Sequence, residues 1–215
     1  MDRVYRRQRH FYDFTRKYYL LGRDRLVRDL EARPGDSIVE IGCGTARNLI
    51  LIARRYPGTR LYGLDASAEM LRTAQEAVDR ARLSDRILLV HALADRLSPA
   101  LFGRDKAFEH AIFSYSLSMI PDWRGALKVA AEWVQPEGFV HIVDFGDLGG
   151  LWGFAAKGLR AWLNLFHVAP RDELLSWLEG GAAAGDRFRL TVWFGRYAFV
   201  LKASPAVIGE LSERR

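Results

Sequence analysis

The segment VEIGCGT, residues 39–45, places two glycines directly after a short apolar run. An apolar run over residues 37–41 leads into it and a helical pattern over residues 46–55 follows at once, which predicts a strand, a tight turn and the start of a helix. Gly42 and Gly44 let the backbone approach a ligand without a Cβ in the way, and a helix N-terminus favours negative or polar groups. We therefore expect a small-molecule site at this turn.

The residues around the two glycines limit which ligand fits. A nicotinamide dinucleotide would need a third glycine where Arg47 stands, and a P-loop would need a Gly-Lys-Ser/Thr sequence that the chain lacks. Glu40, before the first glycine, disfavours a pyrophosphate and favours a ligand with positive charge and no phosphate. S-adenosylmethionine, with its ammonium and sulfonium groups, meets both conditions. Asp65 ends the next apolar run, in GLDAS, where a carboxylate reaches ribose hydroxyls.

Beyond the turn, short apolar runs alternate with helical patterns, which is typical of βαβ units and of a parallel sheet covered on both faces. Right-handed crossovers then give a Rossmann-like, doubly wound α/β sheet of seven strands. The last two runs are separated only by Gly195 and indicate a C-terminal hairpin, so one strand is antiparallel in a mostly parallel sheet. The expected strands are residues 37–41, 61–64, 87–90, 111–113, 139–143, 187–194 and 196–203, and the expected helices are residues 46–55, 67–82 with Ser67 as N-cap, and 123–134.

Length and composition bound the class of protein. The chain has 215 residues and a mass of 24.5 kDa, with 49% hydrophobic and 27% charged residues, which suits one soluble α/β domain and excludes a disordered tail or a coiled coil. Cys43 is the only cysteine, so no internal disulfide is possible and a reducing cytoplasm is expected. No run is apolar and long enough for a membrane-spanning helix, and the charged N-terminus does not look like a secretory signal.

Charge is uneven along the chain. The net charge is +6 with a pI near 9.7, and residues 1–33 hold ten Lys or Arg against five Asp or Glu. This excess suggests an anionic partner, either nucleic acid or a lipid surface. We divide the chain into an aromatic, helical N-terminal lid at residues 1–33, a cofactor domain at 34–203 and a C-terminal tail at 204–215. Within the domain, residues 146–170 form an apolar insert, whose aromatic stripe from Trp152 to Phe166 suits an interfacial helix or a core helix.

Together, VEIGCGT and GLDAS resemble the motifs of class I S-adenosylmethionine-dependent methyltransferases, over roughly residues 34–203. In that family the glycine-rich turn lies against the methionine part of the cofactor and the acid after the second strand binds ribose. The segment after the third strand flanks adenine, and the end of the fourth strand faces the methyl group. Many members have Asp where Leu93 stands here, so the adenine amino group is left to Asp95 or to backbone. The resemblance implies S-adenosylhomocysteine as product and these cofactor-binding residues: Glu40, Gly42, Cys43, Gly44, Asp65, Ala66, Leu93, Ala94 and Ser114.

A narrower resemblance rests on YYLLGRD in the lid, SYSLSMIPDW after the fourth strand and HIVDFGD at the end of the fifth. These segments are similar to bacterial N-methyltransferases of betaine-lipid synthesis, which trimethylate diacylglyceryl homoserine. Phosphatidylethanolamine N-methyltransferases share much of the pattern. The resemblance implies a lipid head-group amine as acceptor, an anionic membrane surface as partner, no nucleic acid, and a cytoplasmic enzyme peripheral on the inner face of the membrane. Arg23 is then expected to hold a carboxylate of the cofactor or of homoserine.

Methyl transfer to an amine needs further groups. A nitrogen that becomes cationic and more methylated suits aromatic faces, for which Tyr12, Tyr19 and Tyr115 are candidates. His141 and Asp144 are candidates for a base or an orienting group, and a buried structural role for His141 is equally open.

Other functions stay open at this point. A basic, aromatic-rich methyltransferase could act on RNA, although SYSLSM stands where base-amine methyltransferases carry an N-P-P-[YF] type motif. An apolar insert could also cover the prenyl tail of a quinone precursor, and the chain could bind S-adenosylmethionine without catalysis. The five histidines show no metal-ligand spacing, so no metal is expected.

Overall fold

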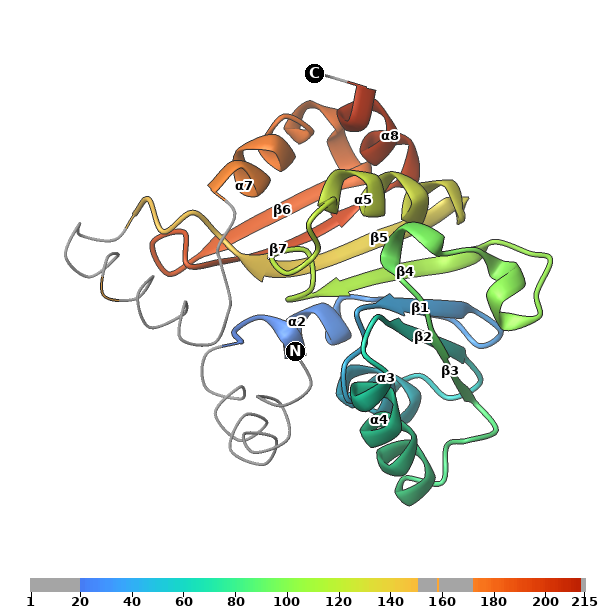
Figure 1. The fold of residues 1–215 in the computed structure, drawn as a ribbon. Helices are drawn as coiled ribbons and strands as arrows, with labels where there is room; N and C mark the ends of the chain where they lie inside the picture. The colour runs from blue at the N-terminus through green and yellow to red at the C-terminus, as the bar shows by residue number, and fades with distance from the viewer. Residues whose placement is uncertain (1–19, 151–157, 159–171, 214–215) are drawn as a thin grey trace.

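The computed structural model describes residues 20–150, 158 and 172–213, and Figure 1 shows the seven-stranded sheet at its centre. The strand order is β3-β2-β1-β4-β5-β7-β6. β7 is antiparallel to both of its neighbours, and the other neighbouring pairs are parallel. The expected doubly wound α/β sheet, with one antiparallel strand in a C-terminal hairpin, is therefore confirmed. The strands are β1 (Ser37–Ile41), β2 (Arg60–Asp65), β3 (Ile87–His91), β4 (Phe108–Ser114), β5 (Val134–Phe145), β6 (Phe188–Trp193) and β7 (Ala198–Ala203).

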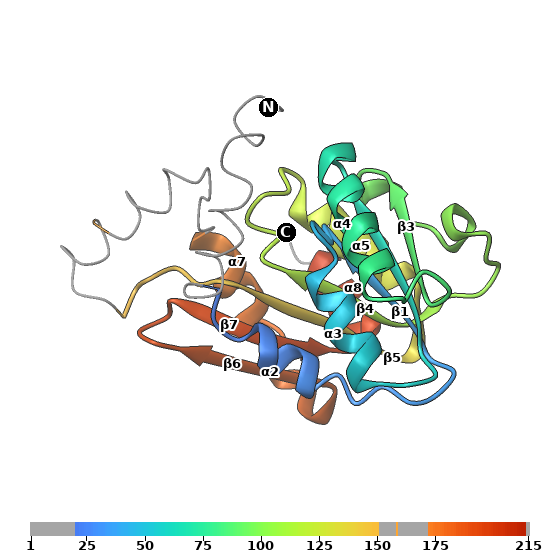
Figure 2. The same cartoon turned by 90° about the horizontal axis from the view of Figure 1, so that it is seen from below.

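Helices cover both faces of this sheet. α2, α3 and α4 lie on one face and α5, α7 and α8 on the other (Figures 1 and 2). Because neighbouring residues of a strand point to opposite faces, Ile38 joins the core that holds α3, while Val39 joins the core that holds α5. The helices are α2 (Arg23–Arg28), α3 (Arg47–Arg55), α4 (Ala68–Arg80), α5 (Trp123–Glu132), α7 (Asp172–Glu179) and α8 (Pro205–Glu213), and short 3-10 helices are η1 (Ala94–Arg96), η2 (Pro99–Phe102) and η3 (Ala182–Arg187).

The boundaries of α4 and β5 show how local chemistry sets the elements. Ser67 caps α4 as expected, because its side chain accepts a hydrogen bond from Met70 N at 3.3 Å. The helix expected to reach residue 134 ends at Glu132 instead, and β5 begins at Val134, ahead of Pro136. The register between β4 and β5 shifts in this stretch, and such an irregular strand start tolerates the missing N–H of proline.

The C-terminal segment expected as a tail is folded. Residues 205–213 form α8, whose Val207, Ile208 and Leu211 are buried in the same core as α5. The apolar positions of this short helix therefore complete one face of the sheet, and α7, which the sequence did not predict, adds three buried leucines to the same core.

The expected boundary of the lid at residue 33 falls inside a packed unit. Leu26 and Val27 of α2 are buried together with the apolar side of α3, and the Tyr56 hydroxyl donates to the Val27 carbonyl at 2.9 Å. The part of the lid that is described, from residue 20 onward, is thus integral to the core.

Several expectations fall on residues outside the described ranges. They concern Tyr12, Tyr19 and the apolar stripe at residues 152–166. Within those ranges, no helix is both long enough and apolar enough to cross a bilayer.

Candidate functional site

The turn after β1 contains two glycines, Gly42 and Gly44, whose backbone conformation and lack of a side chain shape this site. Gly42 has φ +75°, and a Cβ on it would lie 2.6 Å from the Cβ of Ser116, so only glycine fits there. Gly44 has φ +55°, and a Cβ on it would meet no atom within 4 Å. Two backbone N–H groups, of Gly42 and Cys43, donate to the Leu64 carbonyl at 2.9 and 3.1 Å and fix the turn against β2. The space beside Gly44 is therefore open to a ligand.

Glu40 supplies a buried carboxylate below this turn. Its side chain is 2% exposed, and Oε1 accepts a hydrogen bond from Asn48 Nδ2 at 2.6 Å. Arg23 in turn donates from Nη2 to Asn48 Oδ1 at 3.0 Å. Burial raises the pKa of Glu40 to about 7, against the lowering effects of Asn48 and Arg23.

Three buried oxygens at this edge of the sheet have no hydrogen-bond partner among the described residues. They are Glu40 Oε2 and Ser114 Oγ, at the ends of β1 and β4, and Ser118 Oγ in the segment after β4. Buried polar atoms are nearly always paired in folded proteins. Their positions suit a ligand that brings hydrogen-bond donors, and the ammonium group of S-adenosylmethionine would satisfy Glu40.

Asp65 joins the turn to the start of α4. Its Oδ2 accepts from Gly44 N at 2.8 Å, and its Oδ1 accepts from Ser67 N at 2.8 Å. An ionised carboxylate has about four acceptor positions, so two backbone bonds leave capacity for two ribose hydroxyls. The arrangement agrees with the predicted role of this residue.

The remaining cofactor candidates lie around the same edge. Leu93 follows β3 and is 58% exposed, which gives an apolar surface suited to the face of a base, and Ala94 begins η1. Ala66 is exposed next to Asp65, and its carbonyl lies 3.0 Å from His91 Nε2. Cys43 is buried, and burial raises the pKa of its thiol, so it is an unreactive wall of the turn.

Tyr115 and Asp144 hold the segment that follows β4. Tyr115 is 3% exposed, packs edge-on against Phe145 at 4.6 Å, and its hydroxyl donates to the Leu21 carbonyl at 2.6 Å. Asp144 is fully buried and accepts from Ser118 N at 3.2 Å and from Phe145 N at 2.8 Å. Both residues therefore have positioning roles in the structure, and the Tyr115 ring is packed inside the protein and is not an open wall for a cation.

His141 is not at this edge, contrary to the expectation that it is a base or an orienting group. Its Nε2 lies 3.1 Å from His110 Nδ1, and His110 Nε2 lies 3.4 Å from a carboxylate oxygen of Asp36, which precedes β1. This pair points toward the amino ends of the strands. Burial lowers the pKa of His141, so the ring is a neutral core residue. No cluster of three or more His, Cys, Asp or Glu side chains in the described ranges is arranged to hold a metal ion.

A pocket of about 280 Å³ adjoins the turn and was not predicted. Arg47, the first residue of α3, forms part of its wall, and Trp193 at the end of β6 forms another part. Three arginines of α2 also line this space, which we call the arginine pocket. They are Arg23, Arg25 and Arg28, and the rest of the lining is Leu20, Leu21, Gly22 and Asp24. The excess of basic residues near the N-terminus indicated positive charge in this region. No sequence pattern, however, predicts that Trp193 lies beside α2.

The charges in the arginine pocket are only partly neutralised by the described residues. Arg25 pairs with Asp29 at 2.6 Å, and its guanidinium lies 5.9 Å from the centre of the Trp193 ring. Arg47 lies 3.9 Å from Asp24, at the limit of an ion pair. Arg28 is exposed and forms no ion pair within the described part of the chain. The pocket therefore favours an anionic group.

Comparison with known proteins agrees with the fold and the turn. Residues 38–138 match the methyltransferase domain family. The chain is 36% identical over 142 residues, 63% of its length, to trans-aconitate 2-methyltransferase of Afipia carboxidovorans, and 28% identical over 170 residues, 76% of its length, to demethylmenaquinone methyltransferase of Geobacillus stearothermophilus. These matches cover 51% and 70% of the two relatives, so the chain spans about half the length of the first.

Among solved structures, a methyltransferase dependent on S-adenosylmethionine from Aquifex aeolicus has a TM-score of 0.62 with 16% identity, covering 87% of this chain and 92% of that one. At 16% identity, this similarity shows a shared fold and nothing more. The family match and the fold together support a methyltransferase domain of the class I S-adenosylmethionine-dependent type over residues 38–138. Its cofactor is S-adenosylmethionine, and the relatives named above point by name to trans-aconitate and a quinone precursor, not to a lipid amine.

Proposed function

We propose that this chain is an N-methyltransferase that acts on the amine of a lipid head group, with diacylglyceryl homoserine as the first candidate and phosphatidylethanolamine as the second. It would work from the cytoplasmic side at an anionic membrane surface. The observation that carries the proposal is the arginine pocket beside the glycine-rich turn, which combines guanidinium groups with the indole of Trp193. Arginine binds carboxylates and phosphates, and an indole face attracts a methylated ammonium group.

On this proposal, each residue of the candidate site has a defined role. Glu40 holds the cofactor ammonium, Asp65 holds the ribose, and the open side of Gly44 leaves room for the ligand. S-adenosylmethionine supplies an electrophilic methyl group on a sulfonium. Asp144 and Tyr115 fix the segment after β4 that faces this edge, so the contribution of the protein is mainly alignment, which is worth about 7–11 kcal/mol in well-oriented reactions.

One observation favours a second candidate, a small polycarboxylate acceptor. The same arginines would bind several carboxylates, and the relative from Afipia carboxidovorans is by name a trans-aconitate methyltransferase. The two candidates share the anion but differ in the atom methylated, an amine nitrogen against a carboxylate oxygen.

A methyl-transfer assay separates these acceptors. The purified chain is given radiolabelled S-adenosylmethionine with a total bacterial lipid extract, with trans-aconitate, or with demethylmenaquinone, and the products are resolved by chromatography. Label in a lipid amine supports the proposal, and label only in trans-aconitate or in the quinone overturns it. Arg47→Gln should reduce transfer to the lipid about tenfold or more, the loss of one charge-assisted contact, whereas Arg54→Gln, an exposed arginine of the same helix, is the matched control.

A further inference from the structure

The turn between β6 and β7 displays a large aromatic ring to solvent. Phe194 is 68% exposed, more than any other large hydrophobic residue in the described part of the chain. Its φ is +50°, and that of Arg196 is +64°. Bulky L-residues rarely adopt this left-handed conformation, and such outliers gather at functional sites. A glycine would be the ordinary residue at this position, so the ring is displayed against a local conformational preference.

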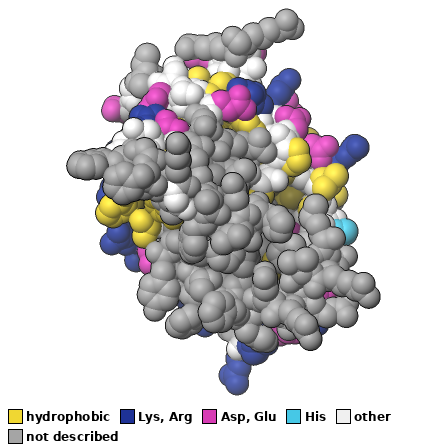
Figure 3. All heavy atoms as spheres, turned by 60° about the vertical axis from the view of Figure 1, so that its left-hand side comes forward, with side chains coloured by type: hydrophobic (Ala, Val, Ile, Leu, Met, Phe, Trp, Pro, Cys, Tyr) yellow, Lys and Arg dark blue, Asp and Glu magenta, His cyan; other side chains and the backbone are white. Residues whose placement is uncertain are grey.

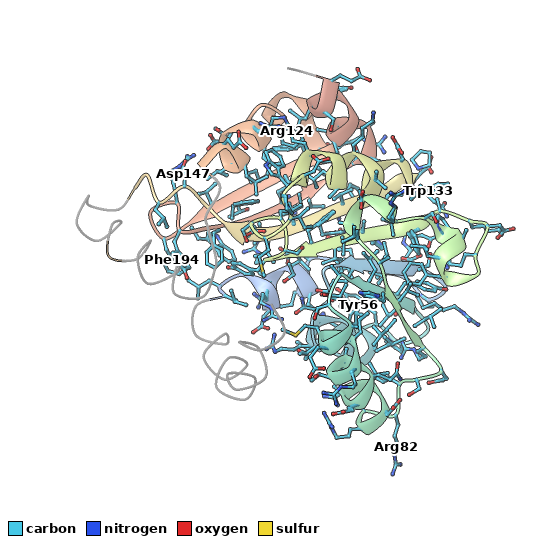
Figure 4. The ribbon with its side chains drawn as sticks, in the orientation of Figure 1. Tyr56, Arg82, Arg124, Trp133, Asp147 and Phe194 are labelled. Atoms are coloured by element: carbon cyan, nitrogen blue, oxygen red, sulfur yellow. The ribbon has the colours of Figure 1, made fainter. Side chains whose placement is uncertain are left out.

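The turn that carries Phe194 is braced. Arg196 donates to both carboxylate oxygens of Asp147, from Nε and Nη2 at 2.8 Å each, and to Glu179 from Nη1 at 2.8 Å. The backbone N–H groups of Leu148 and Gly150 donate to the carbonyls of Arg196 and Gly195 at 3.1 Å each. Figure 4 shows Phe194 and Asp147 on the same side of the molecule. The ring is therefore held out by a fixed support.

This turn lies at the same edge of the sheet as the cofactor site. Ala198 of β7 pairs with Phe145 at the end of β5 and with Trp193 at the end of β6. The β6–β7 turn therefore stands beside the carboxyl ends of the parallel strands, where β1 leads into the glycine-rich turn.

Basic side chains lie near the base of the turn, next to acidic partners of some of them. Trp193, next to Phe194, lines the arginine pocket with Arg25, Arg28 and Arg47. Figure 3, which brings this side of the molecule forward, shows hydrophobic and basic side chains next to one another at one margin of the face. Basic side chains around an exposed aromatic ring are the composition of interfacial membrane anchors.

We propose that Phe194 is a membrane anchor, which enters the head-group region of an anionic bilayer while the arginines at its base contact anionic head groups. This inference rests on the proposed function, because a lipid acceptor requires the cofactor edge to face the bilayer. Docking through this turn brings the arginine pocket to the membrane surface, so that the head group reaches the site while its acyl chains stay in the membrane.

Vesicle sedimentation tests the anchor. The full chain is mixed with vesicles of phosphatidylcholine alone or with added phosphatidylglycerol. We expect binding that needs the anionic lipid, weakens with salt, and falls about tenfold or more in Phe194→Ser, since a large apolar side chain no longer leaves water. The matched control is Leu88→Ser, because Leu88 is 47% exposed on the opposite edge strand, β3. Equal binding of Phe194→Ser and the wild type, or an equal loss in Leu88→Ser, would overturn the anchor.

A second variant guards against misfolding. Phe194→Gly removes the ring and relieves the left-handed backbone, so its melting temperature should rise while vesicle binding falls. A variant that binds vesicles normally despite its higher melting temperature contradicts the proposal.

A methyl-transfer assay with lipid extract dispersed in detergent shows separately whether the proposed acceptor or the proposed anchor is wrong. If Phe194→Ser binds vesicles normally while the wild type methylates lipid amines, only the anchor is wrong. If vesicle binding depends on Phe194 but no lipid is labelled, only the proposed acceptor is wrong.

Discussion

We expect Glu40 to make cofactor binding dependent on pH. Burial raises the pKa of its carboxyl group to about 7, so much of it is protonated in the ligand-free chain below neutrality. A bound ammonium group needs the ionised form, so binding must release the proton. The affinity for the cofactor should therefore rise with pH and level off above the pKa of Glu40 in the ligand-free chain.

The size of the effect follows from the fraction of chains already ionised. With a pKa of about 7, this fraction rises from about 0.03 at pH 5.5 to about 0.5 at pH 7.0, so the affinity should rise about 15-fold. An α-amino group, with a pKa of about 7.7–8.0, keeps its charge over most of this range. The change therefore reports Glu40 rather than the ligand.

Calorimetry with S-adenosylhomocysteine measures both quantities. Titrations at about pH 5.5, 6.0 and 7.0 give the dissociation constant, and paired buffers of different ionisation enthalpy give the protons released, about 0.9 per ligand at pH 6.0. Glu40→Gln should bind more weakly, with no pH dependence in this range and no proton release. If the affinity of the wild type does not change with pH, or if Glu40→Gln shows the same pH dependence, Glu40 does not bind the ammonium group.

Three further substitutions test the site. Asp65→Ala removes the ribose acceptor and should weaken cofactor binding by about 1.5–3 kcal/mol, and calorimetry that shows unchanged affinity would remove Asp65 from the site. Gly44→Val fills the open side of the turn at φ +55°, so it should leave a folded chain by circular dichroism that binds no cofactor; a variant that still binds would mean that the ligand lies elsewhere. Burial raises the pKa of Asp144 to about 6, so the wild type should lose about 2 kcal/mol of stability as pH rises from about 4 to about 6. Urea unfolding of Asp144→Asn should show a smaller fall, and identical pH dependence would count against this assignment.

The features that the sequence predicted are those set by neighbours in the chain. The two glycines follow a short apolar strand directly, and Asp65 ends the next one, so strand, turn and acid could be placed together. The cap at Ser67 is likewise decided within four residues. Local patterns of this kind carry their own conformational and hydrogen-bonding reasons, and the structure preserves them.

The features that were missed depend on contacts between distant segments. Nothing near Trp193 indicates that it shares a pocket with Arg25, because only the order of the strands brings β6 and α2 together. Alternation within a strand predicts which face a side chain occupies but not which partners it meets there. His141 was therefore a candidate for the reactive edge as well as for a buried structural role, and the structure pairs it with His110 toward the amino ends of the strands.

Arg23 connects the two ligand spaces of this protein. Its guanidinium reaches Glu40 through Asn48 and also forms part of the wall of the arginine pocket. A ligand at Glu40 would therefore change the charge and the mobility of Arg23 in the arginine pocket. By thermodynamic linkage, a ligand in the arginine pocket would affect the cofactor site by the same factor. This geometry therefore predicts that the cofactor and the acceptor change each other's affinity by the same factor, which makes Arg23 a point of communication between the two spaces.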